Sequence, residues 1–185
     1  GSMKLVSPDD PILKQPLPTF TDDQMKDYGY DSRQKLSDDM FDFISKTGGI
    51  GLTANQIGMR LNMMVIGGHP SIENGMKLTC FNPVIISTSA EQVSMKEGCL
   101  SYPFLFFNLK RPRKVVVKYR DVNDELQEGH LDGYMSRIFQ HEYDHTEGKT
   151  MLDKVSKFRY NLAMKKADKL MKKHMREMKN AEKDN

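Results

Sequence analysis

Hydrophobic positions recur along this chain at two periods, one typical of helices and one typical of strands. The helical period predicts three helices, at residues 32–46, 132–146 and 156–179. The first should end at Gly48, because glycine readily adopts the left-handed conformation that terminates a helix. In the last helix, apolar residues recur among lysines, and we expect this side to dock on the body through Phe158, Leu162 and Leu170.

Runs rich in β-branched residues predict strands between these helices, at residues 63–66, 78–87, 114–121 and 125–131, with 93–101 leading into a cysteine segment. Pro83 should break the second strand or place it at a sheet edge. The proline-rich residues 3–20 predict an irregular arm, and the glycine-rich residues 49–56 predict a loop. We therefore predict an α+β fold: mostly antiparallel β-sheets packed around a central helix, with a C-terminal helix.

The length and composition suit one globular domain, residues 1–185, with a basic C-terminal helix at about 156–179. No apolar run approaches the ~20 residues that a membrane helix needs, and the N-terminus lacks the pattern of a signal peptide. We expect a cytoplasmic, monomeric protein without a membrane segment. Only two cysteines are present, Cys80 and Cys99, which does not suit a disulfide scaffold.

Charge is unevenly distributed along the chain. Residues 154–185 hold eleven Lys or Arg and four Asp or Glu, a net charge of +7, whereas the whole chain has +3. The rest of the chain therefore carries −4. A basic tail on a slightly acidic body indicates a polyanionic partner, although a merely solvated helix face has the same composition.

The strongest chemical signal is the run His141-Glu142-Tyr143-Asp144-His145 in the predicted helix 132–146. Residues four apart lie on one helix face, so the two imidazoles can bind one metal ion. Glu142, next to the first ligand, can reach a water molecule at the metal. Tyr134 and Ile138 lie on the same stripe and would wall a pocket beside the ion.

A catalytic metal needs a third protein ligand and one open position. The extended motif with a third histidine is absent, because residue 151 is Met, whereas Cys99 follows a glycine that lets the chain approach the metal. Cys80 lies in a predicted strand with no histidine nearby and is expected in the core. Two alternatives remain at this point. A metallopeptidase would need a ligand after His145, and a structural site supporting a nucleic-acid-binding tail would need a fourth ligand.

Three segments in order resemble the signature motifs of peptide deformylases. Residues 49–56 resemble G-x-G-x-A-A-x-Q, residues 97–101 match E-G-C-L-S, and residues 140–148 resemble Q-H-E-x-D-H-x-x-G. The resemblance implies a metal-dependent hydrolase that removes the formyl group from the N-terminal formylmethionine of new polypeptides. It also implies Fe²⁺ in the cell and Zn²⁺ or Ni²⁺ in preparations. Two imidazoles and a thiolate suit these ions and Co²⁺.

The resemblance also assigns roles within the site. Cys99, His141 and His145 would hold the metal, Glu142 would transfer the proton, and the Gln56 amide and Leu100 N–H would stabilise the oxyanion. The methionine side chain would lie against Ile50, Tyr134 and Ile138, while Gly51 and Gly98 would pair with the extended formylmethionyl peptide. The ribosome would be the partner of the basic tail.

Several positions depart from the family pattern. Thr53 stands where the first motif usually has an alanine-type residue, and Thr146 stands where a leucine usually follows the second histidine. Residues 104–107 are unusually apolar, and an arginine common near Phe106 is missing. These departures leave the predicted metal ligands intact but affect contacts to the downstream part of the substrate.

Overall fold

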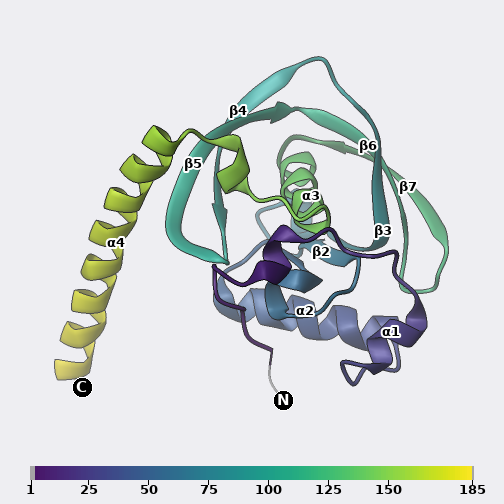
Figure 1. Cartoon of the computed structure of the whole chain (residues 1–185), viewed down its shortest axis with the longest axis horizontal. Coiled ribbons are helices and arrows are strands. Elements are labelled where there is room, and N and C mark those ends of the chain that lie inside the picture. The colour runs from purple at the N-terminus through teal and green to yellow at the C-terminus, as the bar shows by residue number, and fades with distance from the viewer. Residues whose placement is uncertain (1–2, 185) are drawn as a thin grey trace.

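Two antiparallel sheets curve around helix α3 in the computed structural model, which describes residues 3–184 (Figure 1). The larger sheet has the strand order β1-β2-β3-β6-β7, and the smaller one pairs β4 with β5. The helices are α1 (Asp22–Lys26), α2 (Arg33–Thr47), α3 (Gly133–Thr146) and α4 (Lys157–Lys183). The strands are β1 (Gly51–Thr53), β2 (Met63–Gly67), β3 (Lys77–Thr88), β4 (Gln92–Cys99), β5 (Tyr102–Pro112), β6 (Lys114–Arg120) and β7 (Leu126–Asp132). The predicted α+β class is confirmed.

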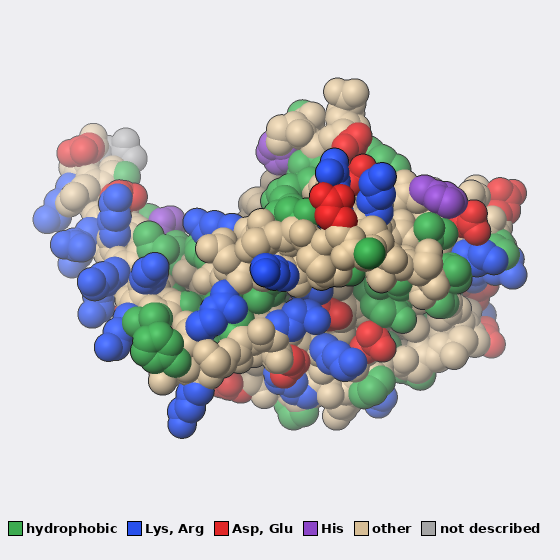
Figure 2. Space-filling view, turned by 90° about the horizontal axis from the view of Figure 1, so that it is seen from above, with side chains coloured by type: hydrophobic (Ala, Val, Ile, Leu, Met, Phe, Trp, Pro, Cys, Tyr) green, Lys and Arg blue, Asp and Glu red, His purple; other side chains and the backbone are tan. Residues whose placement is uncertain are grey.

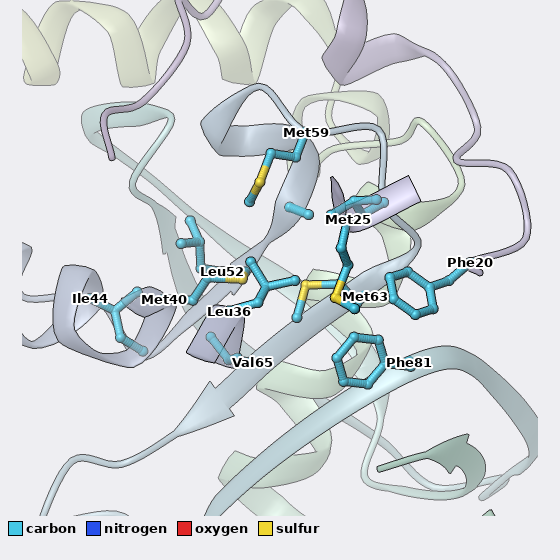
Figure 3. Packing of buried hydrophobic residues seen from close by; sticks show 12 residues of the cluster. Phe20, Met25, Leu36, Met40, Ile44, Leu52, Met59, Met63, Val65 and Phe81 are labelled. Carbon is cyan, nitrogen blue, oxygen red and sulfur yellow. The ribbon is translucent and has the colours of Figure 1, made fainter. Parts of the chain in front are cut away.

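Helix α2 ends as the sequence predicts. The Ser32 hydroxyl caps its N-terminus by accepting from the Lys35 N–H, and Gly48 closes its C-terminus with φ of 77°. The buried face of α2 packs over the inner strands in a cluster that includes Leu36, Met40, Ile44, Leu52 and Val65 (Figure 3). This packing fixes the end of α2 next to the glycine-rich segment that begins β1.

The loop predicted for residues 49–56 is wrong in part. Residues 51–53 form strand β1, which pairs with β2 so that Gly51 lies opposite Ile66 and Thr53 opposite Met64. Residues Ala54–Ile57 form a 3₁₀ turn. All three residues of β1 are buried, and a strand this short cannot display the alternation by which strands are predicted.

Strand β5 was also missed. Its buried positions alternate regularly along the strand: Leu105, Phe107, Leu109 and Arg111. Phe104 and Phe106 lie on the outer, less buried face, and they concealed this alternation within a continuous apolar run. The prediction for Pro83 is wrong, because strand β3 runs unbroken through it and lies at the centre of the larger sheet. Pro83 lies instead at a register shift in the pairing of β3 with β6, between Phe81 and Val84.

The end of α3 is set by a glycine. Gly148 has φ of 74°, and a Cβ at this position would lie 2.6 Å from the backbone carbon of Gln15. The Leu17 N–H also donates to the Thr146 carbonyl oxygen. The irregular N-terminal arm therefore packs directly on the C-terminal end of the helix that carries the histidines.

Helix α4 extends away from the body (Figure 1), and the predicted docking face is wrong. Phe158 is 72% exposed, and Leu162 and Leu170 are also exposed. Ala163 and Ala167 are buried instead, in a cluster with residues of β5. Small residues let the helix approach the strand closely. The prediction followed the spacing of the large apolar residues and so placed the contact on the wrong face. No helix within residues 3–184 is long and apolar enough to cross a membrane.

Candidate metal centre

Helix α3 and the end of β4 bring three predicted ligands together. His141 and His145 lie one turn apart on α3, with ring centroids 5.3 Å apart. Cys99 is the last residue of β4, and its Sγ lies 3.5 Å from His145 Nε2. The donor atoms of the three residues all lie within 4.8 Å of one another. The site residues predicted as metal ligands therefore form one cluster.

The surroundings of His145 suit a metal ligand. Burial, and then the neighbouring His141, hold the pKa of His145 well below its usual value, so its imidazole is neutral and can ligate. The buried His145 Nδ1 has no hydrogen-bond partner within residues 3–184. His141 uses Nδ1 to contact Glu97, which leaves its Nε2 for a ligand. One sulfur and two imidazole donors fit a divalent transition metal.

Glu97 supports the site by contacting one of the predicted metal ligands, a role that the sequence motif did not indicate. It lies two residues before Cys99, so both side chains project from the same face of β4. Its Oε1 lies 2.9 Å from His141 Nδ1, and its carboxylate accepts from Arg111 Nε at 2.6 Å and from Arg137. Burial disfavours the charge on Glu97, but hydrogen bonds from His141 and Arg111 outweigh it and lower its pKa.

The network continues to Asp144, whose carboxylate accepts from Arg111 at 2.9 Å. Arg111 and Arg137 are both buried. Arg111 forms ion pairs with Glu97 and Asp144, and Arg137 forms one with Glu97. The two arginines thus neutralise a buried carboxylate pair beneath the ligands. No local pattern in the sequence indicated this network, because the inward position of Arg111 becomes visible only once β5 is known.

Glu142 lies on α3 directly beside His141 and is almost fully buried. Its Oε1 accepts from the Thr53 hydroxyl at 2.9 Å. Burial raises the pKa of this carboxyl, and the charge of His141 and then the hydrogen bond from Thr53 oppose that shift only in part. A carboxyl group with a raised pKa takes up a proton more readily than an exposed one, which suits a group that accepts and returns a proton.

Gln56 reaches the site from the 3₁₀ turn after β1. Its Oε1 accepts from the Thr53 N–H at 2.8 Å, which orients the side-chain amide. Its Nε2 donates to Ser101 Oγ at 3.0 Å and lies 3.5 Å from Cys99 Sγ. Leu100 follows Cys99 in the turn between β4 and β5, so both predicted oxyanion donors lie next to the cluster.

The residues predicted to contact substrate are only partly gathered here. A Cβ on Gly51 would lie 2.7 Å from Glu142 Oε2 and 2.9 Å from Ile138 Cγ2, so these three residues adjoin. Ile50 packs at the edge of the same cluster as Ile138. Gly98 is covered by the Phe106 ring, 2.7 Å from where a Cβ would be. Tyr134, two turns before His141, is 42% exposed, and its contact with a bound methionine stays a prediction.

The chain is similar to proteins of one family along most of its length. The family model described as polypeptide deformylase matches residues 2–161. A peptide deformylase from Wolbachia of Brugia malayi is 38% identical over 154 residues, which are 79% of this chain and 86% of that protein. The crystal structure of peptide deformylase from Ehrlichia chaffeensis is similar with a TM-score of 0.79 and 29% identity, and the match covers 95% of this chain and 99% of that chain.

Proposed function

Because this chain belongs to the polypeptide deformylase family, we propose that Cys99, His141 and His145 hold its metal ion and that Glu142 transfers the proton. The chain is a metal-dependent hydrolase that removes the formyl group from the N-terminal methionine of nascent peptides. The observation that carries the residue assignment is the convergence of the three donor groups within 4.8 Å, beside a buried glutamate. Membership of this family decides against the metallopeptidase and the structural metal site.

A bound divalent ion would lower the pKa of a water molecule and polarise the formyl carbonyl. Glu142 then accepts the proton of the attacking water and gives it to the leaving amine. Its raised pKa supports this exchange, because the carboxyl must take up and release a proton in one cycle. Gln56 Nε2 and the Leu100 N–H donate to the developing oxyanion, which is the group that most needs stabilisation.

The methionine side chain lies against Ile138 and Ile50, with Tyr134 at the outer end of the wall. The buried position of Ile138 beside Gly51 supports this assignment, since an apolar wall then adjoins the catalytic carboxylate. Gly51 and Gly98 offer backbone groups to an extended formylmethionyl peptide.

The ion in the cell is Fe²⁺ in this proposal, and Zn²⁺, Ni²⁺ or Co²⁺ can replace it in preparations. The mixed sulfur and nitrogen donor set supports each of these ions. Metal analysis of anaerobically purified protein would distinguish these ions.

Helix α4 binds the ribosome through its basic face. Its exposed lysines gather on the outer side of the projecting helix (Figure 2), where RNA phosphate would meet them without disturbing the body. The substrate is a nascent chain, which supports a cytoplasmic location. We propose a monomer that forms a single domain over residues 1–185, and light scattering would test the monomer.

The activity is tested by a deformylation assay on a short formyl-Met peptide, combined with chelation of the metal. Chelated protein should lose turnover and regain it when one equivalent of Fe²⁺ or Ni²⁺ is added, while an acetyl-Met peptide should remain intact. A metal-free protein that keeps full turnover would contradict the proposal.

A further inference from the structure

Thr53 contacts the catalytic carboxylate in this chain, at a position where the first family motif usually has an alanine-type residue. Its hydroxyl lies 2.9 Å from Glu142 Oε1 and 3.0 Å from the Glu142 carbonyl oxygen. A hydroxyl carries one proton, so its donation is shared between two acceptors that both belong to Glu142. Thr53 is fully buried, which excludes water as a competing partner for this proton.

The geometry of β1 explains this contact. Alternate residues of a strand project to the same face, so Gly51 and Thr53 both face α3. Pairing with β2 holds them in register, with Thr53 opposite Met64. Gly51 leaves room for Glu142 Oε2, while Thr53 donates to Oε1. The two carboxylate oxygens therefore have different surroundings.

This difference bears directly on proton transfer. Oε1 is held by the Thr53 hydroxyl, and Oε2 has no hydrogen-bond partner within the described residues 3–184. A carboxylate with one anchored oxygen cannot rotate freely about its terminal bond, so the other oxygen keeps a constant direction. A side chain with no hydroxyl at residue 53 would leave both oxygens of this buried group without the anchor.

We propose that Thr53 is a positioning residue that anchors Glu142 through Oε1, so that Oε2 is the oxygen that exchanges the proton. The inference rests on the proposed role of Glu142. In each cycle the attacking water gives its proton to Oε2, and the same proton passes to the nitrogen of the leaving amine. Thr53 gains and loses no proton in these steps, and its hydroxyl acts through Glu142.

The test compares three substitutions at Thr53 in metal-loaded protein, with kcat and KM measured on a formyl-Met peptide. Thr53→Val keeps the shape of the side chain without the hydroxyl, and Thr53→Ala covers the case in which valine disturbs folding. Both should lower kcat about tenfold, which is part of the 10²–10⁴-fold effect of general acid–base catalysis, with KM within about twofold. Thr53→Ser keeps the hydroxyl and should retain kcat within about twofold.

Two controls separate positioning from a structural effect. Thr79→Val removes a hydroxyl that bonds Ser37 at 2.6 Å, away from the site, and should leave kcat unchanged. Metal content should stay at one ion per chain in every Thr53 variant. If Thr53→Val and Thr53→Ala keep normal kcat, or if Thr53→Ser loses as much as Thr53→Val, the inference fails.

Glu142→Gln, assayed in parallel, distinguishes this failure from a failure of the proposed site. If Glu142→Gln abolishes turnover while Thr53→Val does not lower it, only the role of Thr53 is overturned. If Glu142→Gln retains turnover, the assignment of Glu142 falls and the role of Thr53 falls with it.

Discussion

His141 Nδ1 lies 2.9 Å from Oε1 of Glu97, which stands two residues before Cys99 on the same face of β4. One strand thus supplies both a metal ligand and the carboxylate that orients another ligand. The same carboxylate binds Arg111 and Arg137, so the charge of Glu97 is balanced within the buried network. The orientation of the histidine pair depends on this network as well as on the helix.

Glu97→Gln should weaken metal binding about 10–100-fold, because removal of an outer partner of a metal-ligating histidine usually has an effect of this size. It should also lower the melting temperature, since two buried arginines lose their shared charge partner. Metal affinity is measured by competition with a chromogenic chelator, and stability by thermal unfolding.

The matched control is Glu128→Gln, which alters an exposed carboxylate 3.0 Å from His130 Nε2. Glu128 forms the same kind of pair on the surface, so its loss should change neither quantity. Equal metal affinity in both variants would show that Glu97 does not orient His141.

The helix with its histidine pair and the cysteine segment could be predicted because each is a local pattern. The network around Glu97 could not, because Arg111 is 14 residues away and Arg137 is 40 residues away. Only the pairing of β4 with β5 and the packing of α3 bring these groups together. The outward Phe104 and Phe106 obscured β5, and β1 was too short to show a period.

Gly51→Ala should lower kcat at least about tenfold. The added methyl group would lie 2.7 Å from Glu142 Oε2, closer than real contacts allow, so the carboxylate or Ile138 must move. Overpacking of this kind costs about 1–3 kcal/mol in stability. Gly129→Ala in strand β7 is the control. Its added methyl group would lie 3.1 Å from the Val117 side chain, which causes similar crowding away from the catalytic carboxylate. A normal kcat for Gly51→Ala would contradict the proximity of Gly51 to the reacting group.

The two cysteines should behave differently. Cys99→Ala should lose most of the bound metal, because only two protein ligands remain. Cys80 is fully buried among apolar residues, and burial keeps its pKa high and its thiol neutral. Cys80→Ala should therefore keep one metal ion per chain and lose only some stability. Inductively coupled plasma mass spectrometry measures the metal, and equal loss from both variants would mean that Cys99 is not a specific ligand.

Ribosome binding should depend on the charge of α4 and not on its presence alone. Ala163 and Ala167 pack on β5, so removal of the helix would expose part of the core. Replacement of the exposed Lys169, Lys172 and Lys173 by glutamate avoids this problem. The variant should sediment poorly with ribosomes at low salt, while kcat/KM on a short formyl peptide stays unchanged.

The control is a variant with the same change of net charge on the body. It replaces the exposed Lys4, Lys114 and Lys118 by glutamate. It should sediment like the unchanged protein, and its binding should fall with rising salt. If the α4 variant sediments equally well, the basic face of α4 is only a solvated helix surface.

Glu142→Gln tests the central assignment most directly, because Glu142 is adjacent to a ligand but is not one of the three donor groups. The variant should bind one metal ion per chain and keep its melting temperature near that of the unchanged protein, since glutamine preserves the shape and can still accept from Thr53. Turnover of a formyl-Met peptide should fall by about 10²–10⁴-fold, the usual contribution of a general acid–base residue. Near-normal turnover in fully metal-loaded Glu142→Gln would contradict the account.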